Sequence, residues 1–210
     1  MKPPVLVELF TSQGCSSCPP ADLFMHELAA RDDVIALAFH VDYWDYLFDD
    51  VFGKPAHTER QYGYANTGGR RMVYTPQMII NGRDEIVGNR PEDVKQLITR
   101  SLSAPQTVSL AAERSGGDIV INAQALTGAT RSLLVQVVRF IPRQTVAING
   151  GENSGHEFTY ANIVTDIQEI GRWQTGSPLS LRVATQGSAP MVVILQRPGF
   201  GPVEAAALVH

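Results

Sequence analysis

The sequence predicts an α/β domain, with a central mixed sheet and flanking helices, followed by an all-β sandwich domain. Up to about residue 105, buried strands alternate with amphipathic helices, and a strand–helix–strand unit of this kind implies a parallel pair of strands. From residue 106 onward, short strand-like runs follow one another between turns, with no clear helix. We therefore predict a domain boundary near residue 105, which gives domains at residues 1–105 and 106–210.

The composition is that of a globular chain and excludes several classes of partner. Apolar residues make up 44% of the 210 residues and charged residues 18%, which allows a sizeable core. The net charge of −4 and the absence of a basic run argue against a nucleic-acid partner. No apolar run reaches the ~20 residues that span a bilayer, so we expect no membrane span. Without a leader-like N-terminus we expect a cytoplasmic protein as written, or a periplasmic one if a native leader is missing.

The first predicted elements form a strand–helix–strand unit. The apolar run at 5–10 predicts a buried strand, in which Glu8 is the one polar residue. Pro19 and Pro20 suit the first turn of a helix, because the N–H groups that they lack would have no partner there. Apolar residues at i, i+3 and i+4 continue this helix, and a second buried strand follows at 34–41.

The rest of the first half is an irregular aromatic segment followed by a hairpin and a helix. Asn81-Gly82 is a strong signal for a two-residue hairpin turn. Pro91 opens the last helix, and acidic residues after it suit a first turn. The predicted elements are a short helix at 58–64, strands at 77–80 and 85–88, and a helix from 91 that stops before Pro105.

Seven strand-like runs separated by turn signals fill the second half. This number of short strands over roughly a hundred residues is typical of a β-sandwich. The predicted strands are 107–112, 118–123, 133–141, 158–170, 179–185, 191–196 and 203–208. The polar turn Gly151-Glu152-Asn153-Ser154-Gly155-His156 is interpreted as a plain hairpin loop, with a contact to the first domain or to a partner as the alternative.

Both cysteines of the chain lie in one C-x-x-C motif, between the first strand and the first helix. A helix N-terminus carries partial positive charge, which lowers a thiol pKa and favours the reactive thiolate. This predicts thiol–disulfide exchange, with Cys15 as the exposed attacking thiol and Cys18 as the resolving thiol. Half of a zinc site and an inert pair are the alternatives, although no second pair of cysteines completes four ligands.

Glu8 is a second candidate for the catalytic site. A carboxyl group in an apolar strand is expected to have a raised pKa. It could then move a proton to or from Cys18 during exchange. The alternative is that Glu8 lies at a sheet edge or pairs with an arginine.

The segment that follows the second strand offers a metal-binding alternative. His40 and Asp42 would face the same side of a strand, so with the dithiol and Asp45 nearby a copper or zinc site is conceivable. The favoured interpretation is a solvated strand end beside an aromatic loop. Its rings are expected to pack in the core or at a domain interface, with a peptide-binding surface as the alternative; they are Tyr43, Trp44, Tyr46, Phe48 and Phe52. No organic cofactor is predicted, because no Gly-rich phosphate-binding loop follows a strand.

Four segments and the order of the elements resemble known proteins. The segments are Val7–Asp22, His40–Tyr46, Tyr74–Gln77 and Gly151–Asn153. They resemble the bacterial domain-of-unknown-function family 1223, and the element order of the first domain is similar to the thioredoxin fold. The resemblance implies a cis Pro76 facing the dithiol, with Thr75 offering backbone groups to a substrate. The dipeptide Ser16-Ser17 departs from thioredoxin, so its reducing power is not implied.

The predicted function is therefore that of a thiol–disulfide oxidoreductase acting on protein or small thiols, with an unidentified redox partner. A metal-handling protein that uses the dithiol and a non-catalytic binding protein on the same scaffold are the alternatives. Reductants, oxidants and isomerases share such a dithiol and differ in its potential, so the residues predict the reaction and not its direction.

Overall fold

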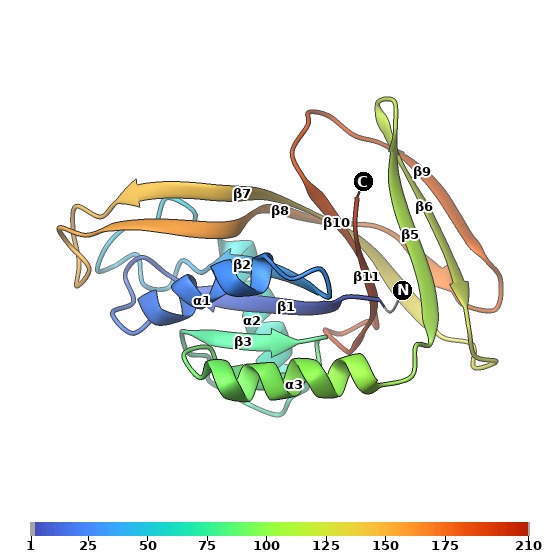
Figure 1. Ribbon diagram of the computed structural model, residues 1–210, viewed down its shortest axis with the longest axis horizontal. Coiled ribbons are helices and arrows are strands. Elements are labelled where there is room, and N and C mark those ends of the chain that lie inside the picture. Colours follow the sequence, from blue (N-terminus) through green and yellow to red (C-terminus); the bar gives the residue numbers. More distant parts are fainter. Residues whose placement is uncertain (1–2, 210) are drawn as a thin grey trace.

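The computed structural model describes residues 3–209 and places two β-sheets and their helices along one long axis (Figure 1). The helices are α1 (Pro19–Ala29), α2 (Pro55–Thr67) and α3 (Pro91–Ser103). The strands of the first half are β1 (Val5–Thr11), β2 (Val34–His40), β3 (Gln77–Ile80) and β4 (Asp84–Val87). Those of the second half are β5 (Val108–Ser115), β6 (Asp118–Ala125), β7 (Ser132–Ala147), β8 (Glu157–Gln174), β9 (Leu179–Ala184), β10 (Met191–Gln196) and β11 (Val203–Leu208).

Within residues 3–209, the strands form an eight-stranded sheet in the order β11-β10-β7-β8-β2-β1-β3-β4 and a three-stranded sheet in the order β5-β6-β9. The large sheet is mixed, because β1 pairs with β2 in parallel and with β3 antiparallel. β8 joins the two halves of the chain through a parallel pairing of Ile163 with Ala38 in β2. The side chain of Asn162 next to it donates a hydrogen bond to the Ala36 carbonyl at 2.8 Å.

The predicted fold class is wrong. Described residues 3–209 are mostly β, with three helices. The large sheet takes strands from both halves of the chain, so the structure is not a thioredoxin-like domain followed by a sandwich. The physical reason is the length of two strands, β7 with 16 residues and β8 with 18. They run along the long axis from the three-stranded sheet to the far end of the molecule (Figure 1). The domain boundary near residue 105 stays a prediction.

The local elements agree with the sequence more closely. The β1–α1–β2 unit is confirmed, and its parallel register runs from Val5 opposite Val34 to Thr11 opposite His40. The hairpin of β3 and β4 is also confirmed, since Asn81 and Gly82 at its turn both have positive φ. All seven strands predicted after residue 106 are present as β5 to β11, with β7 and β8 longer than predicted. The helix predicted at 58–64 is longer too, because α2 begins at Pro55.

Both faces of β1 and β2 are buried, which explains why these strands are continuous apolar runs. One face packs against α1 and α3 through side chains that include Leu9, Met25 and Ile98. The other face packs against α2 and the end of the second half through side chains that include Phe10, Tyr64 and Ile194. The C-terminal end of β1 is thereby fixed between two cores, and the dithiol follows that end directly.

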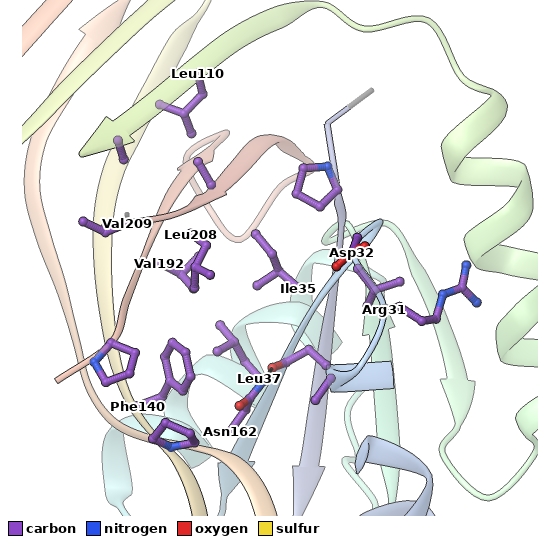
Figure 2. A pocket seen from close by; sticks show the side chains of 18 of the residues that line it. Arg31, Asp32, Ile35, Leu37, Leu110, Phe140, Asn162, Val192, Leu208 and Val209 are labelled. Carbon is purple, nitrogen blue, oxygen red and sulfur yellow. Dashed lines mark hydrogen bonds between the residues drawn. The ribbon is translucent and has the colours of Figure 1, made fainter. Parts of the chain in front are cut away.

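A pocket of about 960 Å³ lies at the opposite end of β1 and β2, between the large sheet and β5. Figure 2 shows apolar side chains such as Ile35, Leu37, Val192 and Phe140 around it. Pro4, just before β1, lines this pocket, whereas Cys15 comes after the other end of the strand. The pocket is therefore separate from the dithiol. Within residues 3–209, no helix has the length and apolar character needed to cross a membrane.

Candidate functional site: the dithiol at the start of α1

Cys15 and Cys18 form a disulfide with their Cα atoms 5.4 Å apart. The Cys18 N–H donates to the Cys15 carbonyl at 3.3 Å, so the two residues share one turn. Cys18 is the N-cap of α1, and Pro19 and Pro20 occupy the first turn as predicted. The prediction that both sulfurs lie together at the start of a helix is confirmed.

The prediction that Cys15 is exposed is wrong for this disulfide state. Cys15 is 2% exposed and Cys18 0%, although Ser16 and Ser17 between them are exposed. The Ser17 hydroxyl lies 3.5 Å from Cys15 Sγ and 3.5 Å from the Thr75 carbonyl oxygen. Access to the sulfur therefore requires the covering side chains to move.

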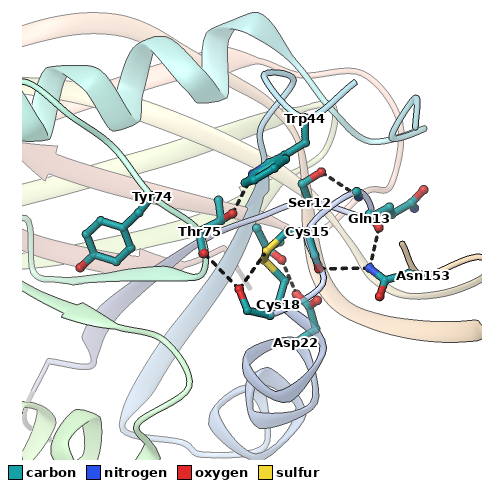
Figure 3. The surroundings of a disulfide bond; sticks show 12 residues. Ser12, Gln13, Cys15, Cys18, Asp22, Trp44, Tyr74, Thr75 and Asn153 are labelled. Carbon is teal, nitrogen blue, oxygen red and sulfur yellow. Dashed lines mark hydrogen bonds between the residues drawn. A yellow bond between two sulfur atoms is a disulfide. The ribbon is translucent and has the colours of Figure 1, made fainter. Parts of the chain in front are cut away.

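Thr75, which precedes Pro76, lies beside the disulfide although it is far from it in sequence (Figure 3). The Thr75–Pro76 peptide bond is cis, which confirms the expectation drawn from the resemblance. The indole N–H of Trp44 donates to Thr75 Oγ1 at 2.8 Å, as Figure 3 shows. Trp44 also packs against Gly14, where an added Cβ would lie 3.2 Å from Trp44 Cβ. The two proposed substrate-binding residues and the aromatic loop therefore form one wall of the site.

Glu8 is buried and bound to groups other than the dithiol. Its carboxylate accepts hydrogen bonds from Arg60 Nε and from the Tyr64 hydroxyl, both at 2.6 Å. Arg60 also donates to the side-chain oxygen of Gln196 at 3.2 Å, so the cluster connects β1, α2 and β10. This is the arginine pairing that the sequence left as the alternative. The proton-relay role of Glu8 stays a prediction, and these contacts do not favour it.

Asp22 is a functional candidate that the sequence analysis missed. It lies four residues after Cys18 in α1, a spacing that places two side chains on the same helix face. Thr11 Oγ1 donates to its carboxyl group at 2.8 Å, and Figure 3 shows Asp22 beside Cys18. Burial raises the pKa of Asp22 to about 7, although the charge of His40 and the Thr11 hydrogen bond lower it. The i+4 spacing from Cys18 is the signal that could have found it.

A buried His40–Asp50 pair supports the loop before Cys15. His40 Nδ1 donates to Asp50 Oδ2 at 2.6 Å, and the Gln13 N–H donates to the same oxygen at 2.8 Å. Burial alone would raise the pKa of Asp50, but His40 and the backbone N–H groups of Gln13 and Phe52 hold it below its usual value. His40 Nε2 has no hydrogen-bond partner among the described residues.

The metal-binding alternative receives no support from this geometry. Asp42 accepts a short hydrogen bond from the Thr58 hydroxyl, while His40 faces Asp50. Among residues 3–209, no group of three or more His, Cys, Asp and Glu side chains is placed to hold a metal ion.

The aromatic loop is only partly packed. Phe52 is buried and forms edge contacts with His40 and Tyr160. Tyr46 is 77% exposed and stacks on Trp44 with ring centroids 6.2 Å apart. The expectation that Tyr46 packs in the core or at a domain interface is therefore wrong, and its exposed ring lies next to the wall of the site.

The hairpin between β7 and β8 reaches the dithiol from the second half of the chain. Asn153 Nδ2 donates to the carbonyls of Gln13 at 2.8 Å and Cys15 at 3.1 Å. The plain-loop interpretation of this turn is wrong, and its alternative, a contact with the first half, is confirmed. No local sequence signal links residues separated by about 140 positions.

Comparisons with known proteins agree on the family and the fold. A protein of Agrobacterium tumefaciens, solved by X-ray crystallography, matches with a TM-score of 0.84 and 32% identity over 97% of this chain and 92% of that one. HBP35 of Porphyromonas gingivalis matches with a TM-score of 0.75 and 12% identity, over 99% of this chain and 75% of that one, which is a likeness of fold alone. The search of curated proteins found no match. The model of the family described as "Protein of unknown function (DUF1223)" matches residues 6–196, and the chain belongs to that family.

Proposed function

We propose that the protein is a thiol–disulfide oxidoreductase that exchanges disulfides with protein thiols through Cys15 and Cys18. The observation that carries the proposal is the disulfide between two cysteines at the N-terminus of α1. A bond that closes so small a loop does little to constrain the unfolded chain, so its value is chemical more than structural. The helix N-terminus stabilises the thiolate that exchange requires.

The reaction proceeds through a mixed disulfide. A substrate thiolate attacks Cys15 Sγ, the Cys15–Cys18 bond breaks, and Cys18 leaves as a thiolate. A second substrate thiolate then attacks the substrate sulfur of the mixed disulfide, and Cys15 leaves as a thiolate. Two electrons pass from the substrate dithiol to the cysteine pair, and the reverse sequence reduces a substrate disulfide.

Proton transfer to the leaving Cys18 is assigned to Asp22. Its carboxyl group shares a helix face with Cys18, and burial places its pKa at about 7, where it both holds and releases a proton. Glu8 is already bound to Arg60 and Tyr64, which supports a role for Glu8 in stabilising the fold.

Protein substrates are favoured over small thiols by the surroundings of the dithiol. Tyr46 and Leu47 are exposed beside Trp44, and the Thr75 carbonyl, which accepts a 3.5 Å hydrogen bond from Ser17, lies next to the loop that carries Cys15. A polypeptide can cover apolar side chains and pair with backbone groups, whereas a small thiol uses little of this surface.

Turnover assays with trapping variants test the proposal. The wild type is expected to reduce insulin in the presence of a reductant or to refold a scrambled disulfide protein, and Cys15→Ser is expected to abolish this activity. Cys18→Ser is expected to accumulate a mixed disulfide through Cys15, visible by mass spectrometry. Full activity of Cys15→Ser would contradict the proposal.

A non-catalytic binding protein is the second candidate, and the burial of Cys15 favours it. In that case the native disulfide resists glutathione until the chain unfolds. Reduction of the folded protein by glutathione, followed by gel shift after alkylation, separates the two candidates.

A further inference from the structure

We propose that Asn153 is a positioning residue that holds Cys15 in the geometry of the disulfide and thereby sets the reduction potential of the Cys15/Cys18 couple. This inference rests on the proposed function, since it concerns the equilibrium of the same cysteine pair. It assigns the second half of the chain a part in the redox chemistry of the first.

The contacts of Asn153 are concentrated on the loop that carries Cys15. A side-chain amide has two N–H donors, and Asn153 directs both to this loop, one to the Gln13 carbonyl and one to the Cys15 carbonyl. Asn153 is 8% exposed, so losing its side-chain amide removes a buried partner from the Gln13 carbonyl and leaves the Cys15 carbonyl with its 3.3 Å hydrogen bond from the Cys18 N–H. Figure 3 shows Asn153 facing the loop on the side away from Trp44.

The hairpin that carries Asn153 is itself held firmly. The Ile148 N–H donates to the His156 carbonyl and the Gly155 N–H donates to the Ile148 carbonyl, both at 2.8 Å. The His156 N–H donates back to the Asn153 carbonyl at 3.3 Å. The amide of Asn153 is thus presented from a closed turn.

Two glycines allow this hairpin to approach the first half closely. A Cβ added at Gly150 would lie 2.7 Å from the ring of Phe48, and one added at Gly151 would lie 2.9 Å from Phe48 Cβ. Gly151 also has a positive φ of 69°. The turn sequence is therefore suited to placing Asn153 against the redox loop, which a plain solvated turn would not require.

Holding this loop favours the oxidised form of the pair. The disulfide forms only when Cys15 Sγ meets Cys18 Sγ, whereas two free thiols have no such requirement. Asp50 fixes the Gln13 N–H and Asn153 fixes the Gln13 and Cys15 carbonyls, so the backbone before α1 is restrained on two sides. The restraint raises the effective concentration of one sulfur at the other, and removing it shifts the equilibrium toward the dithiol.

Equilibration with reduced and oxidised glutathione tests the inference. Asn153→Leu keeps a similar size and removes both donors. It is expected to lower the equilibrium constant for disulfide formation about tenfold, which raises the reduction potential of the Cys15/Cys18 couple by ~30 mV. Asn153→Asp, which keeps the shape and removes the donors, is expected to shift it in the same direction. Glu152→Gln, an exposed neighbour in the same turn, is the matched control and is expected to leave the potential unchanged.

Unfolding both redox forms of each variant separates positioning from general support. Positioning predicts a larger loss of stability in the oxidised form than in the reduced form, equal to the shift in potential. Equal losses in the two forms, with an unchanged potential, would overturn the inference. If Asn153→Leu does not fold, Asn153→Asp and Asn153→Ser provide the same comparison.

The potential is measured on the cysteine pair without a protein substrate. A wild type that turns over insulin, with variants of unchanged potential, overturns the role of Asn153 alone. A wild type without turnover, with variants shifted as expected, overturns the proposed function and retains the role of Asn153.

Discussion

Glu8 and Asp22 are both buried acids near the dithiol, but their surroundings differ. Glu8 is bound by Arg60 and Tyr64 in a cluster that ties β1 to α2 and β10. Asp22 receives one hydroxyl hydrogen bond from Thr11 and has no cation in direct contact among the described residues. The Arg60 guanidinium offsets the cost of burying the Glu8 carboxyl group and makes the pair a structural support, whereas burial without such a partner raises the pKa of Asp22, which can then exchange a proton.

The largest effect is expected from breaking the Glu8 cluster. Arg60→Met leaves the Glu8 carboxylate buried without its cation, which is expected to lower the free energy of unfolding by about 3–5 kcal/mol. Urea denaturation at pH 7 measures this loss. The exposed Arg172–Glu169 pair is the control, and Arg172→Gln is expected to cost below about 1 kcal/mol.

The double variant Glu8→Leu with Arg60→Met sharpens the same contrast. Removing both charges avoids an unpaired buried carboxylate, so this variant is expected to lose less stability than Arg60→Met alone. A greater loss in the double variant would show that packing, and not charge pairing, dominates this cluster.

Replacing Asp22 is expected to raise the free energy of unfolding, by less than the loss of Arg60 lowers it. Its pKa rises from 3.8 in the unfolded chain to about 7 in the folded one, so between these values the folded chain holds a proton that the unfolded chain has released. The free energy of unfolding therefore falls as the pH rises from about 4 to about 7. Above pH 7 the full cost of keeping the ionised Asp22 carboxylate buried is present. The neighbouring charged groups that adjust this window are His40 and Asp50.

Asp22→Asn removes this cost and is expected to stabilise the protein by about 2–4 kcal/mol at pH 8, with little change at pH 4. Thermal or urea unfolding across this pH range measures the difference. Asp32→Asn, at an exposed position just after α1, is the control and is expected to leave the pH profile unaltered. A constant offset at all pH values would contradict the raised pKa.

Much of the local structure could be predicted because it depends on neighbours in sequence. Asn81-Gly82 specifies its own turn, and the C-x-x-C specifies a sulfur pair wherever a helix follows a strand. The pairing of Ile163 with Ala38 could not be predicted, since no local pattern selects a partner strand so far away. The fold class was misassigned because the long strands β7 and β8 join the second half of the chain to the first-half sheet through that pairing.

The residues of the site also divide into those set by local sequence and those brought in by distant segments. Cys15 and Cys18 were found from their motif and the cis Pro76 from the family resemblance, whereas Asn153 and the Arg60 partner of Glu8 come from distant segments. The burial of Cys15 was missed because its cover, Ser17 against Thr75 and Trp44 on Gly14, depends on tertiary packing. Asp22 was within reach of sequence reasoning through its helical spacing from Cys18.

A smaller effect, on activity alone, is expected at the aromatic loop. Tyr46→Ser removes an exposed ring beside the dithiol and is expected to lower kcat/KM for a protein disulfide about threefold to tenfold. Turnover of a small disulfide and the unfolding midpoint are expected to stay unchanged. Tyr62→Ser on α2, also at an exposed ring, is the control. An equal drop for both substrates would argue against protein recognition at Tyr46.

The reduction potential of the Cys15/Cys18 couple in the folded wild type tests the central claim most directly. Equilibration with glutathione or dithiothreitol buffers, followed by alkylation and mass spectrometry, measures it. Reversible exchange predicts a single two-electron transition in the native state above about −300 mV, the range of catalytic disulfides. A disulfide that stays intact below that potential, and is reduced only when the chain unfolds, would contradict the account.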